Sequence, residues 1–381
     1  MLFVAQFKKQ KIVTNNISSF SAIFDSDLNN VPLRENYITR LSGEAPKLVI
    51  AREELKKSVT VFCSLLNLFF FLISLPCVFL ISVFSKNKLR APLHILNLIE
   101  ALHLLTILKK NRINKLHFFN IYEHDANLLA YSISKSGIYV NKIPSEVPLS
   151  FWNKIIVADS LSFCFRYQHD EYKEYKSTMF VKETNDWVPE ISYNLEPFYR
   201  STFPKIAEKT IGFYSSGMWL RKKLGRIETG NKDYENELNL LEVLLNFVKE
   251  RNAYTLKVFL HPLEKKHLQQ TKEYYNTIST SIVLADVNIA NAEQFYNADV
   301  AVTLVSTLAY ERLFWGFKTI VYPVAYSNFP IKESSFRNVC ALSETELKEK
   351  IHIALEQTTE DFFKNNNIEN YRYNNYKTFN S

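Results

Sequence analysis

The sequence has little glycine, with 7 residues in a chain of 381. It contains neither G-x-G-x-x-G nor G-x-x-x-x-G-K-[S/T]. These patterns make the backbone cradles of dinucleotide-binding proteins and of P-loop proteins, so neither class is supported in its usual form. A bound phosphate group would instead be held by side chains and by the N-termini of helices.

Cysteine is also sparse, and none of the four cysteines forms a C-x-x-C pair. A disulfide framework or a zinc site is therefore not predicted, and a reducing compartment is the simpler interpretation. Lysine and arginine exceed the acidic residues, giving a net charge of +7, but they are scattered along the chain. This pattern does not indicate nucleic-acid binding, whereas it is compatible with an anionic nucleotide or an anionic lipid surface.

One long stretch, residues 60–84, has no charged residue at all. Its 25 residues exceed the roughly 20 that a helix needs to cross the hydrocarbon core. Basic residues flank both ends, so the orientation stays open. Asn67 and Pro76 interrupt the run, which leaves three interpretations: a spanning helix, a hairpin in one leaflet, or a buried pair of core helices. We expect an apolar helical segment that associates with a membrane.

The remainder of the chain is of the α/β class. Residues 91–109 carry leucines at helical spacing and are predicted to form a helix that lies on a membrane or on a sheet. Beyond them, short apolar runs alternate with helical patterns, as in parallel sheets with helical connections. The predicted parts are 1–58, which either stands alone or belongs to the first α/β domain, then a membrane-associated segment 59–110, an α/β domain 111–203, an α/β domain 204–363 and a polar tail 364–381.

Candidate ligand-binding residues gather in the second half. His261-Pro262 ends the apolar run 255–260, and Ser306-Thr307 stands before a predicted helix 308–315. In parallel sheets, ligands bind at the carboxyl ends of strands, which is where both pairs are expected. The simpler interpretations are a surface histidine and an ordinary helix cap.

Two further features extend this candidate site. Glu311 follows Thr307 by one helical turn, where it could reach a ribose hydroxyl or form a surface pair near Arg312. Ser215 and Ser216 precede Gly217 directly after a predicted strand, 211–214, and could let a phosphate approach closely. The basic stretch 219–230 that follows is predicted to be a loop.

The pattern H-P followed after 45 residues by S-[S/T]-x-x-x-E resembles the donor half of GT-B glycosyltransferases. The most similar patterns are those of bacterial sialyltransferases, capsule Kdo transferases and CDP-glycerol glycerophosphotransferases. The resemblance covers roughly residues 205–345 and implies two Rossmann-like domains. It also implies that His261, Ser306 and Thr307 bind the phosphates of a CMP- or CDP-activated donor.

The sequence departs from that group in the first domain. Sialyltransferases carry two acidic residues followed by glycine there, and this chain has no such triplet. Glu123 and Asp125, at a predicted strand end, are the candidates for the base that deprotonates the acceptor hydroxyl. Asp170-Glu171 and Glu146 are alternatives, and all of them could equally be solvated turn residues.

These features predict a GT-B-type, metal-independent glycosyltransferase of bacterial capsule or other surface-polysaccharide biosynthesis. It would take a nucleotide-sugar donor, with a CMP-sugar favoured, and a glycan or lipid-linked acceptor. It would act at the cytoplasmic face of the inner (plasma) membrane without a cofactor or nucleic acid. The alternatives are a CDP-polyol phosphotransferase with the same donor pocket and a non-catalytic membrane-associated protein of the same fold.

Overall fold

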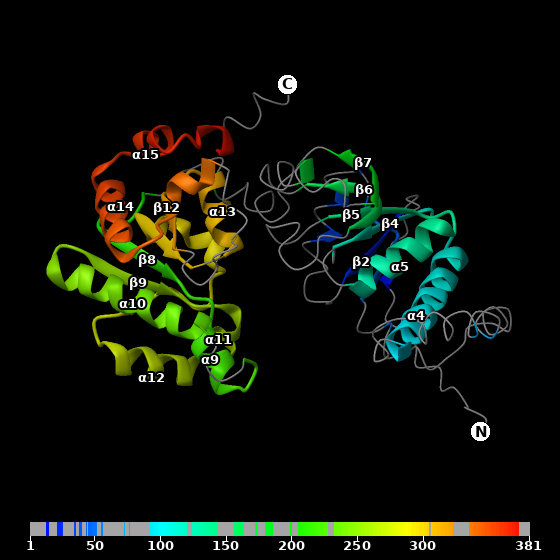
Figure 1. Ribbon diagram of the computed structural model, residues 1–381, viewed down its shortest axis with the longest axis horizontal. Helices are drawn as coiled ribbons and strands as arrows, with labels where there is room; N and C mark the ends of the chain where they lie inside the picture. Colours follow the sequence, from blue (N-terminus) through cyan, green and yellow to red (C-terminus); the bar gives the residue numbers. More distant parts are fainter. Residues whose placement is uncertain are drawn as a thin grey trace. The chain divides into compact units, whose positions relative to one another are not determined.

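The chain divides into two compact units, Met1–Asn194 and Leu195–Ser381, and each is described by itself. Both are drawn in Figure 1, with the residues described here in colour. The computed structural model describes residues 13–14, 21–25, 34–35, 38–39, 43, 45–51, 55, 72, 76, 91–119, 124–143, 156–163, 172–173, 180–185, 199, 205–227, 232–304, 306–322 and 335–372.

The first unit is built on a seven-stranded sheet in the order β1-β3-β2-β4-β5-β6-β7. Its first pair, β1 and β3, is antiparallel, and all the other pairs are parallel. The strands are β1 (Val13–Thr14), β2 (Ser21–Asp25), β3 (Leu48–Ala51), β4 (Lys115–Phe118), β5 (Tyr139–Lys142), β6 (Val157–Ser162) and β7 (Phe180–Asn185). The predicted α/β class is therefore confirmed for this unit.

Two helices, α4 (Ala91–Lys110) and α5 (His124–Lys135), lie side by side against this sheet (Figure 1). Leu104 and Leu108 of α4 share one buried core with Leu129 of α5 and with Leu116 of β4. The helix predicted at 91–109 is thus confirmed, and its second half packs on the sheet. None of the helices in the described ranges is long and apolar enough to cross a membrane. The predicted membrane segment at 60–84 lies outside those ranges except for Leu72 and Pro76.

Strand β6 is continuous from Val157 to Ser162 although polar residues lie within it. Asp159 in its middle is buried, yet it does not break the strand because its carboxylate has partners. The Ser134 hydroxyl and the Val140 backbone N–H each donate to it at 2.8 Å, and Lys182 forms an ion pair with it. A buried carboxylate with such donors is tolerated in a sheet.

The second unit has a five-stranded, fully parallel sheet in the order β10-β9-β8-β11-β12. Its strands are β8 (Thr210–Tyr214), β9 (Thr255–Phe259), β10 (Val283–Leu284), β11 (Val300–Thr303) and β12 (Thr319–Val321). The α-helices are α9 (Met218–Lys223), α10 (Lys232–Glu250), α11 (Pro262–Lys266), α12 (Leu268–Ile278), α13 (Thr307–Phe314), α14 (Glu344–Glu356) and α15 (Thr359–Asn365). Short 3-10 helices are η4 (Asn291–Asn297), η6 (Ser335–Val339) and η7 (Glu369–Tyr371).

One prediction is wrong in this unit: the basic stretch 219–230 begins within helix α9 and is not all loop. Trp219 and Leu220 are buried, and they anchor the helix to the body of the unit. The Trp219 ring stacks on Tyr274 of α12 with 4.1 Å between ring centroids, and its indole N–H donates to Glu264 of α11. Tertiary contacts thus stabilise a helix that is too short to be stable alone.

A buried arginine, Arg312 of α13, joins several elements of the second unit. Its side chain is fully buried and has aromatic rings around it, including that of Tyr214 at 5.5 Å. All of its hydrogen-bond partners in the described ranges are neutral, so their dipoles balance its charge. They are the hydroxyls of Tyr214 (3.1 Å) and Thr319 (3.1 Å) and the carbonyls of Phe295 (2.6 Å), Ala298 (3.3 Å) and Lys318 (3.3 Å).

Candidate functional site

The candidate residues of the second unit follow three adjacent strands, β9, β8 and β11. His261 follows β9, Ser215 and Ser216 follow β8, and Ser306 with Thr307 follows β11. All three strands are parallel, so their carboxyl ends lie at one edge of the sheet. With neighbouring strands ~4.8 Å apart, the ends of β9 and β11 are separated by ~10 Å.

His261 is held by the helix that it starts. Its Nδ1 accepts a hydrogen bond from the Leu263 backbone N–H at 3.1 Å, as the N-cap of α11. Its own backbone N–H donates to the Glu264 carboxylate at 2.8 Å, which completes a capping box. Burial and the nearby Arg221 guanidinium lower the pKa of His261 to about 4. The imidazole is therefore neutral at physiological pH.

Two buried glutamates support the loops at this edge. Glu264 also accepts from the Tyr275 hydroxyl at 3.0 Å, and burial raises the pKa of its carboxyl. Glu237 of α10 accepts from the Ser215 hydroxyl at 3.0 Å and from the backbone N–H groups of Ser216 and Met218, the latter at 2.7 Å. Burial and the neighbouring Glu264 raise the pKa of Glu237 to about 7.

These bonds determine what the loop after β8 can offer a ligand. The Ser215 hydroxyl is buried and donates to Glu237, and it also accepts from the Gly217 N–H at 3.0 Å. The N–H groups of Ser216 and Met218 already have Glu237 as acceptor. Ser215 therefore stabilises the loop and is not available to a ligand. Of the two serines, only Ser216, whose side chain is half-buried, could contact a phosphate.

Gly217 lies close to His261, and its replacement by alanine is expected to disturb the site. Its φ of 68° is in the left-handed region, and an added Cβ would lie 3.3 Å from the Cβ of His261. The substitution is expected to cost about 1–2 kcal/mol of stability and to weaken nucleotide binding, measured by urea unfolding and calorimetry. Gly225→Ala is the matched control, because its φ is 65° and its Cβ would have no neighbour within 4 Å. Equal binding losses in both variants would contradict the expectation.

Ser306 and Thr307 start α13 as predicted. Ser306 is the N-cap, with its hydroxyl oxygen accepting from the Leu308 N–H at 3.2 Å and its carbonyl accepting from the Ala309 N–H at 3.1 Å. Its hydroxyl hydrogen can still be donated to a ligand. Thr307 is the first helical residue, and its side chain is outside the described part of the chain. The positive end of the α13 dipole adds to the attraction of this turn for an anion.

Glu311, one turn further along α13, is the most unusual residue of the site. Its side chain is buried, and neither carboxyl oxygen has a hydrogen-bond partner among the residues that the structure describes. Burial raises its pKa to about 8, because nothing nearby compensates the desolvation of the charge. A surface ion pair near Arg312 is thus ruled out, since both residues are buried and Arg312 bonds elsewhere. When ionised, the carboxylate would present two acceptors side by side, which suits a pair of vicinal hydroxyls.

The candidate bases of the first unit are less completely described. Asp125 is the second residue of α5, and its side chain is outside the described residues. Glu123, Glu146 and the pair Asp170-Glu171 fall outside them altogether. The assignment of the base to Asp125 or Glu123 therefore stays a prediction.

No group of three or more His, Cys, Asp or Glu side chains able to hold a metal occurs within the described ranges. The sequence does contain one Asp-x-Asp tripeptide, Asp25-Ser26-Asp27, at the carboxyl end of β2. Paired carboxylates of this kind suit Mg²⁺. The Asp25 side chain and both following residues lie outside the described part, so metal-independent chemistry remains a prediction.

Sequence reasoning missed three residues of this site: Arg221, Glu237 and Glu264. Glu264 could have been found, because it stands three residues after His261, in the position of a capping-box glutamate. Arg221 was hidden in a stretch interpreted as a loop. No local signal marks Glu237, since its partners lie 19–22 residues earlier and are reached only through the fold.

No protein-family model matches the sequence, and no curated protein does. Solved structures match at the level of the fold. A UDP-N-acetylglucosamine 2-epimerase has a TM-score of 0.51 at 11% identity, covering 91% of this chain and 90% of that one. A putative UDP-N-acetylglucosamine 2-epimerase from Listeria monocytogenes has a TM-score of 0.50 at 9% identity, covering 90% of each chain. The UDP-GlcNAc 2-epimerase from Methanocaldococcus jannaschii, in complex with UDP-GlcNAc and UDP, has a TM-score of 0.46 at 11% identity, covering 89% and 93%.

The likeness of the first two structures extends over both units and establishes the fold as GT-B-like. The expected α/β class, with parallel sheets, is confirmed at this level. The narrower resemblance to sialyltransferases and capsule Kdo transferases has no counterpart among these structures. At 9–11% identity the comparison carries no statement about substrate or reaction.

Proposed function

We propose that this protein is a glycosyltransferase that moves a sugar from a nucleotide-activated donor, held by the second unit, to an acceptor hydroxyl. The buried, unpartnered carboxyl of Glu311 carries this proposal. A carboxyl group without a partner costs stability in a protein interior, and such costs are concentrated at functional sites. The two hydroxyls of a ribose are the complementary donors, and a nucleotide with its ribose at Glu311 can place its phosphate at Ser306 and His261.

The chemistry then follows from the charges. When the bond between the anomeric carbon and the phosphate oxygen breaks, its electron pair stays on that oxygen. Donors from Ser306, the start of α13 and the neutral imidazole of His261 stabilise the developing charge, and this is electrostatic catalysis. The acceptor oxygen forms the new bond to the anomeric carbon, and its proton passes to a carboxylate of the first unit, for which Asp125 and Glu123 are the candidates.

Nucleotide binding tests the proposal most directly. Calorimetry with CMP, CDP, UDP and GDP should show one preferred nucleotide, and the resemblance favours cytidine. His261→Ala and Ser306→Ala should each weaken its binding about tenfold, which corresponds to about 1.4 kcal/mol. If the chain binds no nucleotide, the proposal fails. If a CDP-polyol is then the active donor and the polyol phosphate is the group transferred, the reaction is a polyol phosphate transfer at the same site.

The acceptor and the location complete the proposal. An acceptor that is a growing surface glycan or a lipid-linked sugar would give the uncharged run 60–84 a purpose at the cytoplasmic face of the plasma membrane. Sedimentation of the purified chain with vesicles of anionic phospholipid tests the membrane association. A chain that stays in the supernatant would contradict it.

A further inference from the structure

Arg221 lies against His261 at the edge of the second unit, and the contact is unusual for two basic groups. Its Nη2 is 3.5 Å from the His261 Nε2. Its Nε is buried and has no hydrogen-bond partner within the described part of the chain. The acidic groups of this region, Glu237 and Glu264, are already occupied by hydrogen bonds from the loops that they support.

The tautomer of His261 decides what this contact means. A neutral imidazole has one N–H donor and one acceptor nitrogen. Nδ1 accepts from the Leu263 N–H at 3.1 Å, a normal length, whereas the contact between Nε2 and Arg221 is at the outer limit for a hydrogen bond. Keeping the helix cap therefore places the proton on Nε2. Both Nε2–H of His261 and the guanidinium of Arg221 are then donors.

Two donors that face one another cannot satisfy each other, but together they can bind a single anionic oxygen. The guanidinium is always charged and presents several N–H groups in a planar fork, which suits phosphate oxygens. The imidazole adds a directed neutral donor, held in place by the cap of α11 and by Glu264. The close approach of Gly217 to His261 also brings the loop before α9, and hence Arg221, to this position.

We propose that Arg221 and His261 together bind one phosphate oxygen of the donor nucleotide, with Arg221 supplying the positive charge and His261 acting only as a neutral donor. This proposal rests on the proposed function, because it concerns the same nucleotide. It adds a phosphate-binding residue from α9, and it assigns the cationic role to an arginine rather than to the histidine. The phosphate, and not the base or ribose, is the part recognised by the pair.

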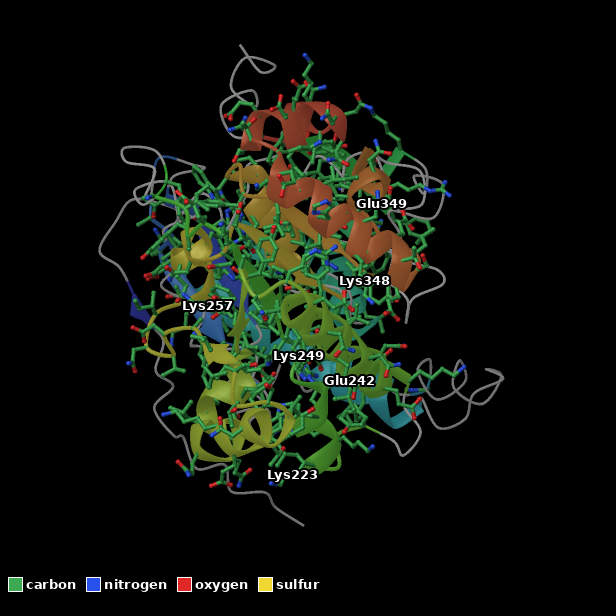
Figure 2. All side chains as sticks on the ribbon, turned by 90° about the vertical axis from the view of Figure 1, so that its left-hand side faces the viewer. Lys223, Glu242, Lys249, Lys257, Lys348 and Glu349 are labelled. Atoms are coloured by element: carbon green, nitrogen blue, oxygen red, sulfur yellow. The ribbon has the colours of Figure 1, made fainter. Side chains whose placement is uncertain are left out.

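The test compares Arg221→Met and Arg221→Lys with a matched control. Methionine keeps most of the apolar stem and removes the charge, and lysine keeps the charge without the fork. Lys223→Met removes the same charge from the same helix at an exposed position two residues away (Figure 2). Calorimetry on the full chain would use the preferred nucleoside phosphate as probe, with its nucleoside and inorganic phosphate as separate arms.

We expect Arg221→Met to weaken binding of the nucleotide at least tenfold and to leave binding of the nucleoside within twofold. Arg221→Lys should recover part of the loss, and Lys223→Met should change the affinity less than twofold. As the salt concentration rises, the nucleotide affinity of the wild type should also fall more steeply than the nucleotide affinity of Arg221→Met.

Several results would overturn the proposal. If the wild type binds a nucleotide and Arg221→Met binds it equally well, Arg221 has no such role, although the proposed function stands. If Arg221→Met weakens binding of the nucleoside as much as binding of the nucleotide, the residue acts through the general structure of the site. If inorganic phosphate alone binds at the pair and nucleotides do not, the pair is a free phosphate site and the proposed function fails. If the wild type binds none of the probes, both proposals fail.

Discussion

Replacing Arg312 by methionine is expected to destabilise the second unit by about 3–5 kcal/mol. The substitution keeps an apolar stem of similar length but removes a donor from five groups, of which only the carbonyls of Phe295 and Lys318 keep a backbone N–H donor within the described ranges. A buried acceptor without a partner costs about 1–3 kcal/mol, and the removal of a central buried charge leaves several at once. Urea unfolding monitored by circular dichroism measures the change.

The control for Arg312 is Arg226→Met, which removes the same charge from an exposed position. Its effect should stay within about 0.5 kcal/mol, as is usual for surface substitutions. A similar small effect at Arg312 would show that the carbonyls find other donors or water, and would contradict its role in joining β8, η4 and β12.

Replacing Glu311 by glutamine is expected to act in the opposite direction on stability and to impair binding. Glutamine has nearly the same shape but cannot ionise, and its amide nitrogen donates where a ribose hydroxyl needs an acceptor. Nucleotide affinity should fall at least tenfold, because hydrogen bonds to a charged carboxylate contribute about 1.5–3 kcal/mol. Calorimetry with the preferred nucleotide measures this part.

The pH dependence of stability gives a second, independent readout for Glu311. Its pKa in the folded protein is about 8, compared with a usual value of 4.5. Between these values the folded chain keeps the proton and the unfolded chain releases it, so the contribution of this group to stability falls as pH rises. The fall can reach about 1.4 kcal/mol per pH unit across the window and ends above the folded pKa.

Wild type and Glu311→Gln should therefore have similar free energies of unfolding near pH 5, and the variant should become the more stable one toward pH 8. Urea titrations at pH 5, 6, 7 and 8 give the difference. A constant difference across this range would show that the carboxyl is not held protonated in the folded chain. A variant that is both less stable at pH 8 and unchanged in nucleotide affinity would make Glu311 an ordinary core residue.

The proposed nucleotide should change the charge of Glu311. Ribose hydroxyls stabilise the ionised carboxylate, so binding near pH 7 is accompanied by release of a proton from a carboxyl that is mostly protonated beforehand. This linkage explains how a group that costs stability in the free chain can still contribute to function. The cost is recovered when the ligand supplies the missing donors.

Several features were available from the sequence by itself. The apolar runs 211–214 and 255–260 predicted strands β8 and β9, and leucines at helical spacing in 91–109 predicted α4. Ser306 was expected at a helix start because a hydroxyl before a helical pattern caps the first N–H groups whatever the rest of the fold does. His261 was placed correctly at the end of β9, since the following proline ends the strand.

The tertiary structure decided which of these elements meet. Helix α9 is held by contacts that Trp219 makes with Glu264 and with Tyr274, 45 and 55 residues later, so a local pattern could not predict it. Arg312 bonds to Tyr214 across 98 residues because β8 and β11 are neighbours in the sheet although they are far apart in sequence. The same non-local order brings Arg221 to His261 and leaves Glu311 without a partner. The sequence determines local conformation through short-range sterics and helix capping. The contacts that give a site its charge and its unpaired groups depend on the order of the strands in the sheet, and that order is set only by the tertiary structure.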